Sequence, residues 1–334
     1  MTTSPAGLSG AWARALMTVD ERAAWAECAL QPRDLEILRA LWAHHFLTTD
    51  QIAALWWATE NPRPAQRRMA RLFAAGHVER FRPRLPKGSF PWTYALTRTG
   101  FNQARRHRAL PEAARFVERP LHNFQYVVHD LDLNAWVVAY RALIGDAFLG
   151  WAGEQESETR PPSAKQPGRL EIEDGLTIEG LSDPRPQPLR PDSVLELELP
   201  NEDGFGSFLV EYDRTRRPDK IRRKLARYDA FLCWWWRHTE RYGSRLDAPY
   251  ALFVCQDDAH VQAFCAAADM ELRGHEWAAR LDPEEHVFPA RERILFVNAR
   301  RAQRGSLEAW ALPGFPPGHP AREAGGSRRT TLPS

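Results

Sequence analysis

The sequence predicts a two-domain protein of the mixed α+β or α/β class. Its 334 residues exceed the usual size of one domain. Residues 31–120 contain 16 Lys and Arg against 7 Asp and Glu, whereas residues 121–334 contain 27 against 33. A basic segment and an acidic segment are therefore joined in a chain whose formal net charge is only +2. The helical and strand-like patterns along the chain separate the same two parts.

The basic part, residues 31–110, is expected to begin with three helices. Apolar residues recur at helical spacing over 34–46. Thr48 followed by Gln51 three residues later has the pattern of a capping box at the start of a second helix. A third helix is expected over about 64–75, and Gly76 follows it where a C-terminal glycine belongs.

Two short strand-like runs complete the basic part. They cover 78–84 and 92–96, on either side of Lys87-Gly88. Three helices followed by two strands are typical of a winged helix-turn-helix, in which the third helix enters the major groove of DNA and the loop between the strands forms the wing.

The third helix carries arginines four residues apart, opposite its apolar residues. Arginine suits guanine edges and phosphates, and glutamine suits adenine. The predicted contacts to double-stranded DNA are Arg63, Gln66, Arg67, Arg68, Arg71, Arg80, Arg82, Arg84 and Lys87. The alternative is that these side chains form only a solvated surface. Their place on the third helix and on a basic wing favours nucleic-acid binding.

The acidic part, residues 121–312, predicts a small mixed sheet flanked by helices, an α/β arrangement. A Pro-rich excursion at 157–191 interrupts it, and a hairpin around Asp174-Gly175 is one option there. Residues 1–30 are expected to be a partly helical lead-in. The tail, 313–334, is rich in Pro, Gly, Arg and Ser and is expected to be disordered.

Carboxylates mark the ends of two predicted strands in the acidic part. Asp192 opens one strand, and Glu211 and Asp213 end the next on the same face. Acidic groups on a buried face are costly unless they pair with a cation or a metal. Asp192, Glu211 and Asp213 are the expected ligands of a Mg²⁺ ion that polarises a phosphate, and Lys224 would neutralise developing charge. The alternative is that the carboxylates pair only with Lys224 or with Arg214, Arg216 or Arg217.

The order of several short motifs resembles the replication-relaxation proteins of plasmids and other mobile elements. The segments that carry this resemblance are Leu47–Ile52, Arg67–Leu72, Tyr94–Gly100, His129–Leu131, Arg190–Asp192, Leu209–Thr215 and Lys224–Tyr228. The resemblance spans roughly residues 33–270. It implies a winged helix followed by a core similar to the PD-(D/E)xK nuclease fold, and a role in plasmid replication and DNA relaxation.

Residue by residue, the resemblance assigns catalytic positions to Asp192, Glu211 and Lys224. Asp192 matches the first acidic position of the nuclease pattern, and Glu211 matches the second. The pattern then requires a lysine where this chain has Asp213, and Lys224 on the next helix would supply the cation instead. Glu154 or Glu156 would supply a further carboxylate.

Three hypotheses for function follow. The first is a DNA-binding protein that nicks DNA with Mg²⁺. The second is a DNA-binding protein whose nuclease-like core is a non-catalytic scaffold. The third is a transcription or replication regulator whose second domain senses a ligand or forms a homodimer. Replication or mobilisation proteins are expected partners beside double-stranded DNA.

The four cysteines form no CxxC pair and no zinc spacing, which favours free thiols in a reducing compartment. No apolar run approaches the roughly 18 residues that a membrane span needs. The sequence therefore predicts a cytoplasmic protein with no membrane partner.

Overall fold

The computed structural model describes residues 28–57, 61–82, 90–118, 124–161, 169–171, 177–179, 188–199, 204–214, 218–233, 235–274, 288–322 and 325–332. These residues form two compact units, one ending at Val138 and the other beginning at Ala139. Predictions for Arg84, Lys87 and residues 1–27 lie outside the described residues. None of the described helices combines the length and apolar character that a membrane crossing requires.

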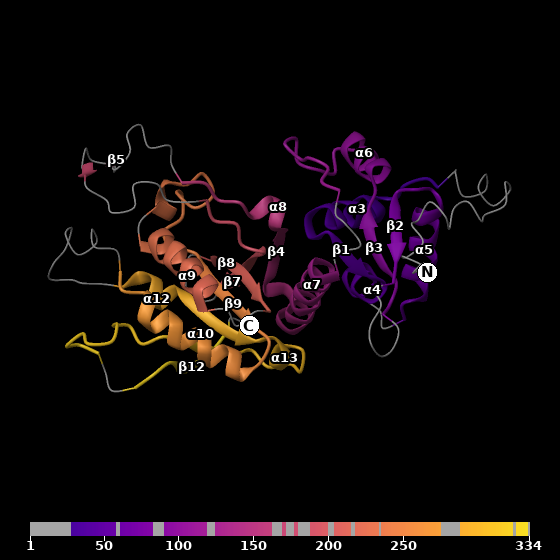
Figure 1. Cartoon of the computed structure of the whole chain (residues 1–334). Coiled ribbons are helices and arrows are strands. Elements are labelled where there is room, and N and C mark those ends of the chain that lie inside the picture. Colours follow the sequence, from indigo (N-terminus) through magenta and orange to yellow (C-terminus); the bar gives the residue numbers. More distant parts are fainter. Residues whose placement is uncertain are drawn as a thin grey trace, which may run out of the picture. The chain divides into compact units, whose positions relative to one another are not determined.

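The first unit alternates helices with three short strands (Figure 1). The elements in chain order are α3 (Pro32–His44), β1 (Phe46–Thr48), α4 (Thr49–Trp56), α5 (Arg63–Ala74), β2 (Val78–Phe81), β3 (Thr93–Leu96), α6 (Arg98–Arg106) and the start of α7 (Phe124–Ile144). The strands form an antiparallel sheet in the order β1-β3-β2. The three predicted helices of the basic part are therefore present. Helices α3 and α5 are displaced from the expected bounds by two residues or fewer, and α4 begins directly after the predicted cap, Thr48.

Local capping chemistry sets the ends of α4 and α5. Thr48 Oγ1 accepts a hydrogen bond from the Gln51 amide, and Gln51 Oε1 accepts one from the Thr48 amide, which confirms the predicted capping box. Gly76 takes a positive φ of 78°, and its amide donates to Phe73 O, while the His77 amide donates to Leu72 O. These paired bonds form a Schellman motif, so Gly76 ends α5 as predicted.

Helix α7 completes the first unit by holding the backbone around β1. Asn134 Nδ2 donates to His44 O (3.1 Å) and to Phe46 O (2.7 Å). Gln51 Nε2 donates to Leu131 O (3.2 Å). Val127 and Leu131 pack against Phe46, so this helix buries an apolar face as well.

The second unit is built on seven described strands in one mixed sheet. In spatial order they are β12 (Arg328–Thr331), β11 (Glu308–Ala311), β10 (Ile294–Asn298), β9 (Tyr250–Cys255), β8 (Gly204–Asp213), β7 (Ser193–Leu199) and β4 (Phe148–Gly153). Strands β8, β9 and β10 are parallel to one another, and the other neighbours pair antiparallel. The sheet is mixed, as predicted, but wider than the small sheet expected.

Helices α9 (Pro218–Cys233) and α10 (Asp258–Glu271) connect the parallel strands and pack on one face of this sheet (Figure 1). Leu225, Tyr228 and Phe231 of α9 are buried together with Phe253 of β9 and Phe264 of α10. Short helical segments complete the unit: η1 (Gly145–Ala147), α8 (Glu154–Ser157), η2 (Trp235–His238), α12 (Pro289–Arg293) and α13 (Ala299–Ala302). This apolar core holds α9 against the sheet and so positions the end of β8 beside α9.

Within the Pro-rich excursion, β5 (Arg169–Glu171) pairs antiparallel with β6 (Thr177–Glu179). This pairing matches the hairpin considered around Asp174-Gly175, whose turn lies outside the described residues. Residues 151–156 complete β4 and begin the helical turn α8.

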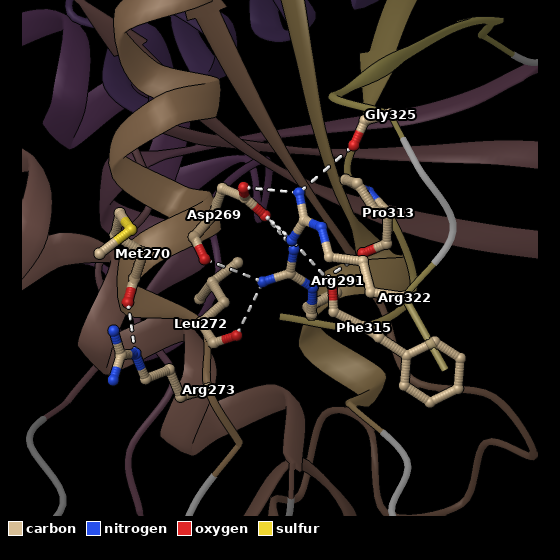
Figure 2. A network of polar contacts seen from close by, with 9 residues as sticks. All are labelled: Asp269, Met270, Leu272, Arg273, Arg291, Pro313, Phe315, Arg322 and Gly325. Atoms are coloured by element: carbon tan, nitrogen blue, oxygen red, sulfur yellow. Dashed lines mark hydrogen bonds and ion pairs between the residues drawn. The ribbon is translucent and has the colours of Figure 1, made fainter. Parts of the chain in front are cut away.

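The C-terminal tail differs from the disorder expected of its composition. Strand β12 pairs with β11, and Leu332 is buried. Arg322 reaches the Asp269 carboxylate, which also accepts a hydrogen bond from the buried Arg291 (Figure 2). Backbone pairing at a sheet edge and a shared ion pair order a segment that has few apolar residues of its own.

Candidate functional site

Helix α5 divides its residues between a buried face and a basic exposed face. Ala65, Met69, Leu72 and Phe73 are buried because their spacing places them on one side of the helix. The predicted DNA contacts of this helix that are exposed to solvent are Arg63, Gln66, Arg67 and Arg71. The helix therefore presents three guanidinium groups and an amide on the side opposite the core.

Arg68 lies between these exposed side chains in sequence but has a different environment. Its Nε donates to Asp34 Oδ1 (2.8 Å), and its Nη2 donates to Asp34 Oδ2 and to Ala29 O. Asp34 is completely buried and also accepts a hydrogen bond from the Gln31 amide at the start of α3. The hydrogen bond that Arg68 donates to Asp34 raises the pKa of the guanidinium. Arg68 thus joins α5 to α3, and its guanidinium is engaged inside the unit.

Two further predicted arginines lie beside an aromatic ring. Arg80 lies over the rings of Phe73 and Trp92, and Arg82 lies over Trp92 with its guanidinium carbon 4.4 Å from the ring centroid. Cation–π contacts of this kind restrict a guanidinium without neutralising it. Arg82 remains exposed, so its charge is held at the surface beside β2. The role of Trp92 was not predicted from the sequence.

The carboxylate cluster of the second unit forms where β8 ends. Lys224 Nζ on α9 lies 2.5 Å from Glu211 Oε2, and Tyr228 Oη donates to Glu211 Oε1 at 2.8 Å. Asp192 Oδ2 accepts a hydrogen bond from the Tyr212 amide at 2.8 Å, which places it at the adjoining end of β7. Of the predicted catalytic residues, the structure therefore brings Asp192, Glu211 and Lys224 together.

The electrostatics of this cluster follow from burial. The Glu211 side chain is 4% exposed, whereas the Lys224 side chain is 32% exposed. Burial raises the pKa of Glu211 to about 7, against the opposing effect of the Lys224 charge. Burial alone would lower the pKa of Lys224, but the charges of Glu211 and Asp192 raise it. Lys224 is therefore the permanently charged partner, and Glu211 is the member that can change its protonation state.

The other predicted carboxylates occupy neighbouring positions. Asp213 is half-buried at the last residue of β8. Glu154 and Glu156 lie on α8, whose Ser157 Oγ donates to Pro191 O (2.7 Å), so this turn is tied to the segment that carries Asp192. Over the described ranges, however, no three carboxylate, histidine or cysteine side chains are gathered so that they could hold a metal ion.

The structure also reveals a basic row on α9 that the sequence analysis missed. Lys220, Arg223 and Arg227 are exposed, three and four residues apart, on the helix that contributes Lys224. The signal was available, since Ile221, Leu225 and Tyr228 set the buried face of the same helix.

Comparison with known proteins supports the resemblance on which several of these assignments rest. The profile of the family described as replication-relaxation matches residues 38–246, a span that includes α5, β2, the cluster at the end of β8 and α9. No curated protein and no solved structure matches the chain. Because the matched span covers more than half of the sequence, the chain belongs to the replication-relaxation family.

Proposed function

We propose that this protein binds double-stranded DNA during the replication or relaxation of a plasmid or other mobile element. The family supplies the biological setting, since its name joins replication with relaxation. The observation that carries the DNA-binding proposal is the exposed row of Arg63, Gln66, Arg67 and Arg71 on α5. Guanidinium and amide groups on one helix face suit base edges in the major groove and the flanking phosphates.

The arrangement of the first unit supports a winged helix-turn-helix as its fold. The chain runs helix, strand, helix, helix, strand, strand, and β3 lies between β1 and β2 in the sheet. In that fold the helix before the last two strands is the recognition helix, which is the position of α5. Arg82, held over Trp92, would contact phosphate from the wing. Arg84 and Lys87 remain part of the proposed wing. Arg68 is left out because its guanidinium already binds Asp34.

For the second unit we propose a nuclease-like core that acts as a scaffold without cutting DNA. Both carboxylate oxygens of Glu211 already accept hydrogen bonds, from Lys224 and Tyr228. One Asp192 oxygen is bound to the Tyr212 amide. Mg²⁺ requires several oxygen ligands in near-octahedral geometry, and among the described residues no three carboxylate, histidine or cysteine side chains are gathered to supply them. The ion pair satisfies the buried carboxylate instead.

DNA binding is tested by titrating duplex DNA with the wild-type protein and with the Arg67→Ala and Arg71→Ala variants. Loss of a guanidinium that contacts a base or a phosphate should weaken binding by about 1–3 kcal/mol, roughly 5-fold to 150-fold. Arg304→Ala is the matched control because Arg304 is an exposed arginine of the second unit. Equal affinities of all four proteins would contradict the proposal.

The scaffold proposal is tested on supercoiled plasmid with Mg²⁺, with Mn²⁺ and with a chelator. We expect retarded but intact supercoils under all three conditions. Open-circular product that requires metal, and that disappears in Asp192→Ala and Glu211→Ala, would show instead that the core is a nuclease.

A further inference from the structure

We propose that α9 is a second DNA-contacting surface, which binds phosphates through Lys220, Arg223 and Arg227. This inference rests on the proposed function and extends it to the second unit. It starts from a contrast in charge: residues 121–334 carry an excess of six acidic groups. Within that acidic part, the sixteen residues of α9 hold five Lys and Arg against two Asp.

The three side chains form one row. They lie three, four and seven residues apart, so an α-helix places them on the same side. Ile221, Leu225 and Tyr228 occupy the opposite side and are buried in the core. At 1.5 Å per residue, the row is roughly 10 Å long, which matches about three phosphates along one DNA strand.

The row is also available for a partner. Lys220, Arg223 and Arg227 are exposed and form no ion pair or hydrogen bond through their side chains with another described residue. The remaining basic residues of α9 differ: Lys224 binds Glu211, and Arg222 Nε lies 3.3 Å from Glu271 Oε1. Among the described residues, α9 therefore has two cations with an anionic partner, Arg222 and Lys224, and three without one.

Phosphate is the ligand that this chemistry favours. Like charges on adjacent turns repel one another. A polyanion that binds the row compensates these charges, and its condensed counterions are released into solution. The row consists of lysine and arginine alone, which suits contact with a backbone more than recognition of a sequence. The proposed partner is the DNA that α5 also binds.

The test is the salt dependence of binding to a linear duplex of mixed sequence, measured with the full-length chain. The variant is Lys220→Ala/Arg223→Ala/Arg227→Ala, and Arg222→Ala is the control from the same helix. The slope of log K against log salt concentration should fall by about 0.9 for each lost contact, or about 2.7 for the triple variant. The control should keep the wild-type slope. Thermal unfolding of each variant establishes that it is folded.

The outcomes distinguish the two proposals. A wild-type slope in the folded triple variant overturns the assignment of α9 and leaves an acidic protein as the better partner for the row. Failure of the wild-type protein itself to bind duplex DNA overturns the proposed function, and the inference with it. A reduced slope in the triple variant supports the assignment of α9. If Arg67→Ala also loses the affinity expected under the proposed function, α5 and α9 are two separate contact surfaces.

Discussion

Lys224 and Glu211 form an ion pair in which the two partners differ in burial: the carboxylate is almost inaccessible, whereas a third of the lysine side chain meets solvent. The pair joins α9 to the end of β8 at the position where the family resemblance assigns catalytic groups. Its geometry explains why a carboxylate can remain inside an apolar core, because Lys224 and Tyr228 satisfy both oxygens.

Replacing Lys224 by Met should destabilise the second unit. The substitution leaves Glu211 buried without its cation. Breaking a fully buried pair costs about 3–5 kcal/mol, and the partial exposure of Lys224 lowers our expectation to about 2 kcal/mol. Because the Lys224 charge lowers the pKa of Glu211, its removal should raise that pKa further above 7. The loss of stability should therefore grow as pH rises above 7, where the wild-type carboxylate is ionised and paired, and should shrink at lower pH, where Glu211 is protonated in both folded proteins. Urea unfolding at pH 6 and pH 8 measures the difference.

The double variant Glu211→Gln/Lys224→Met is the control for that prediction. A neutral amide retains the hydrogen bond with Tyr228 and removes the buried charge, so much of the lost stability should return. If Lys224→Met alone unfolds at the wild-type urea concentration at both pH values, the ion pair contributes nothing to the fold.

Arg67 and Arg68 should respond oppositely to substitution by Ala. Arg68→Ala removes the partner of the buried Asp34 and should lower the free energy of unfolding by about 3 kcal/mol. Arg67→Ala changes an exposed side chain, so stability should stay within about 0.5 kcal/mol while DNA affinity falls. Chemical denaturation and DNA titration of both variants give the comparison. A destabilised Arg67→Ala protein with unchanged affinity would contradict it.

The contrast between these neighbours shows where prediction from the sequence stops. The capping box of Thr48 and the end of α5 at Gly76 were predictable because each depends on residues within five positions. The role of Arg68 depends on Asp34, which is 34 residues away and lies on another helix. The spacing of arginines along a helix does not indicate which of them has a partner elsewhere in the fold.

The second unit shows the same limit of prediction from the sequence. The ends of β9 could be predicted because the strand is a continuous apolar run. Strands β11 and β12 were missed because each has only four residues, and β12, at the sheet edge, consists of arginine and threonine. The proximity of Asp192 and Glu211 was expected from their places at the ends of two predicted strands, whereas the bonding of both Glu211 oxygens depends on how α9 packs.

Asp229 should make the stability of the protein depend on pH. Burial raises the pKa of this carboxyl to about 7, with Cys233 and Arg291 only partly opposing the shift. The folded state therefore binds the proton more tightly than the unfolded chain, and stability falls as pH rises from about 4 to about 7. The slope is at most about 1.4 kcal/mol per pH unit. Asp229→Asn should remove this contribution, so the variant should gain stability relative to wild type as pH increases.

Urea unfolding between pH 5 and pH 8 tests the role of Asp229. Asp247→Asn is a suitable control, because Asp247 is exposed and pairs with Arg293 at the surface. Parallel stability curves for wild type and Asp229→Asn would show that the Asp229 carboxyl titrates alike in the folded and unfolded states.

The Arg291 network should hold the C-terminal segment in place (Figure 2). Arg291 is fully buried, and it donates to Pro313 O (2.8 Å), to Leu272 O (3.0 Å) and to Asp269. Arg322 binds the same Asp269 carboxylate with two nitrogens, each at 2.9 Å. Arg291 therefore binds the C-terminal segment at the backbone carbonyl of Pro313. Arg322 belongs to that segment and anchors it through its own side chain.

Substitutions at Arg291 and Arg322 should differ in how much stability they remove and in whether they expose the C-terminal segment to proteolysis. Arg291→Lys should cost about 3 kcal/mol, because an ammonium lacks the planar set of donors that reaches three carbonyls and a carboxylate at once. Arg322→Ala should cost about 1 kcal/mol, since Asp269 keeps Arg291 as its partner. It should nevertheless speed proteolytic cleavage after residue 312, because the segment loses its side-chain anchor while the rest of the sheet remains. Urea unfolding combined with limited digestion by proteinase K, which does not require arginine at the cleavage site, separates the two effects, and equal cleavage rates in wild type and Arg322→Ala would show that β12 alone retains the segment.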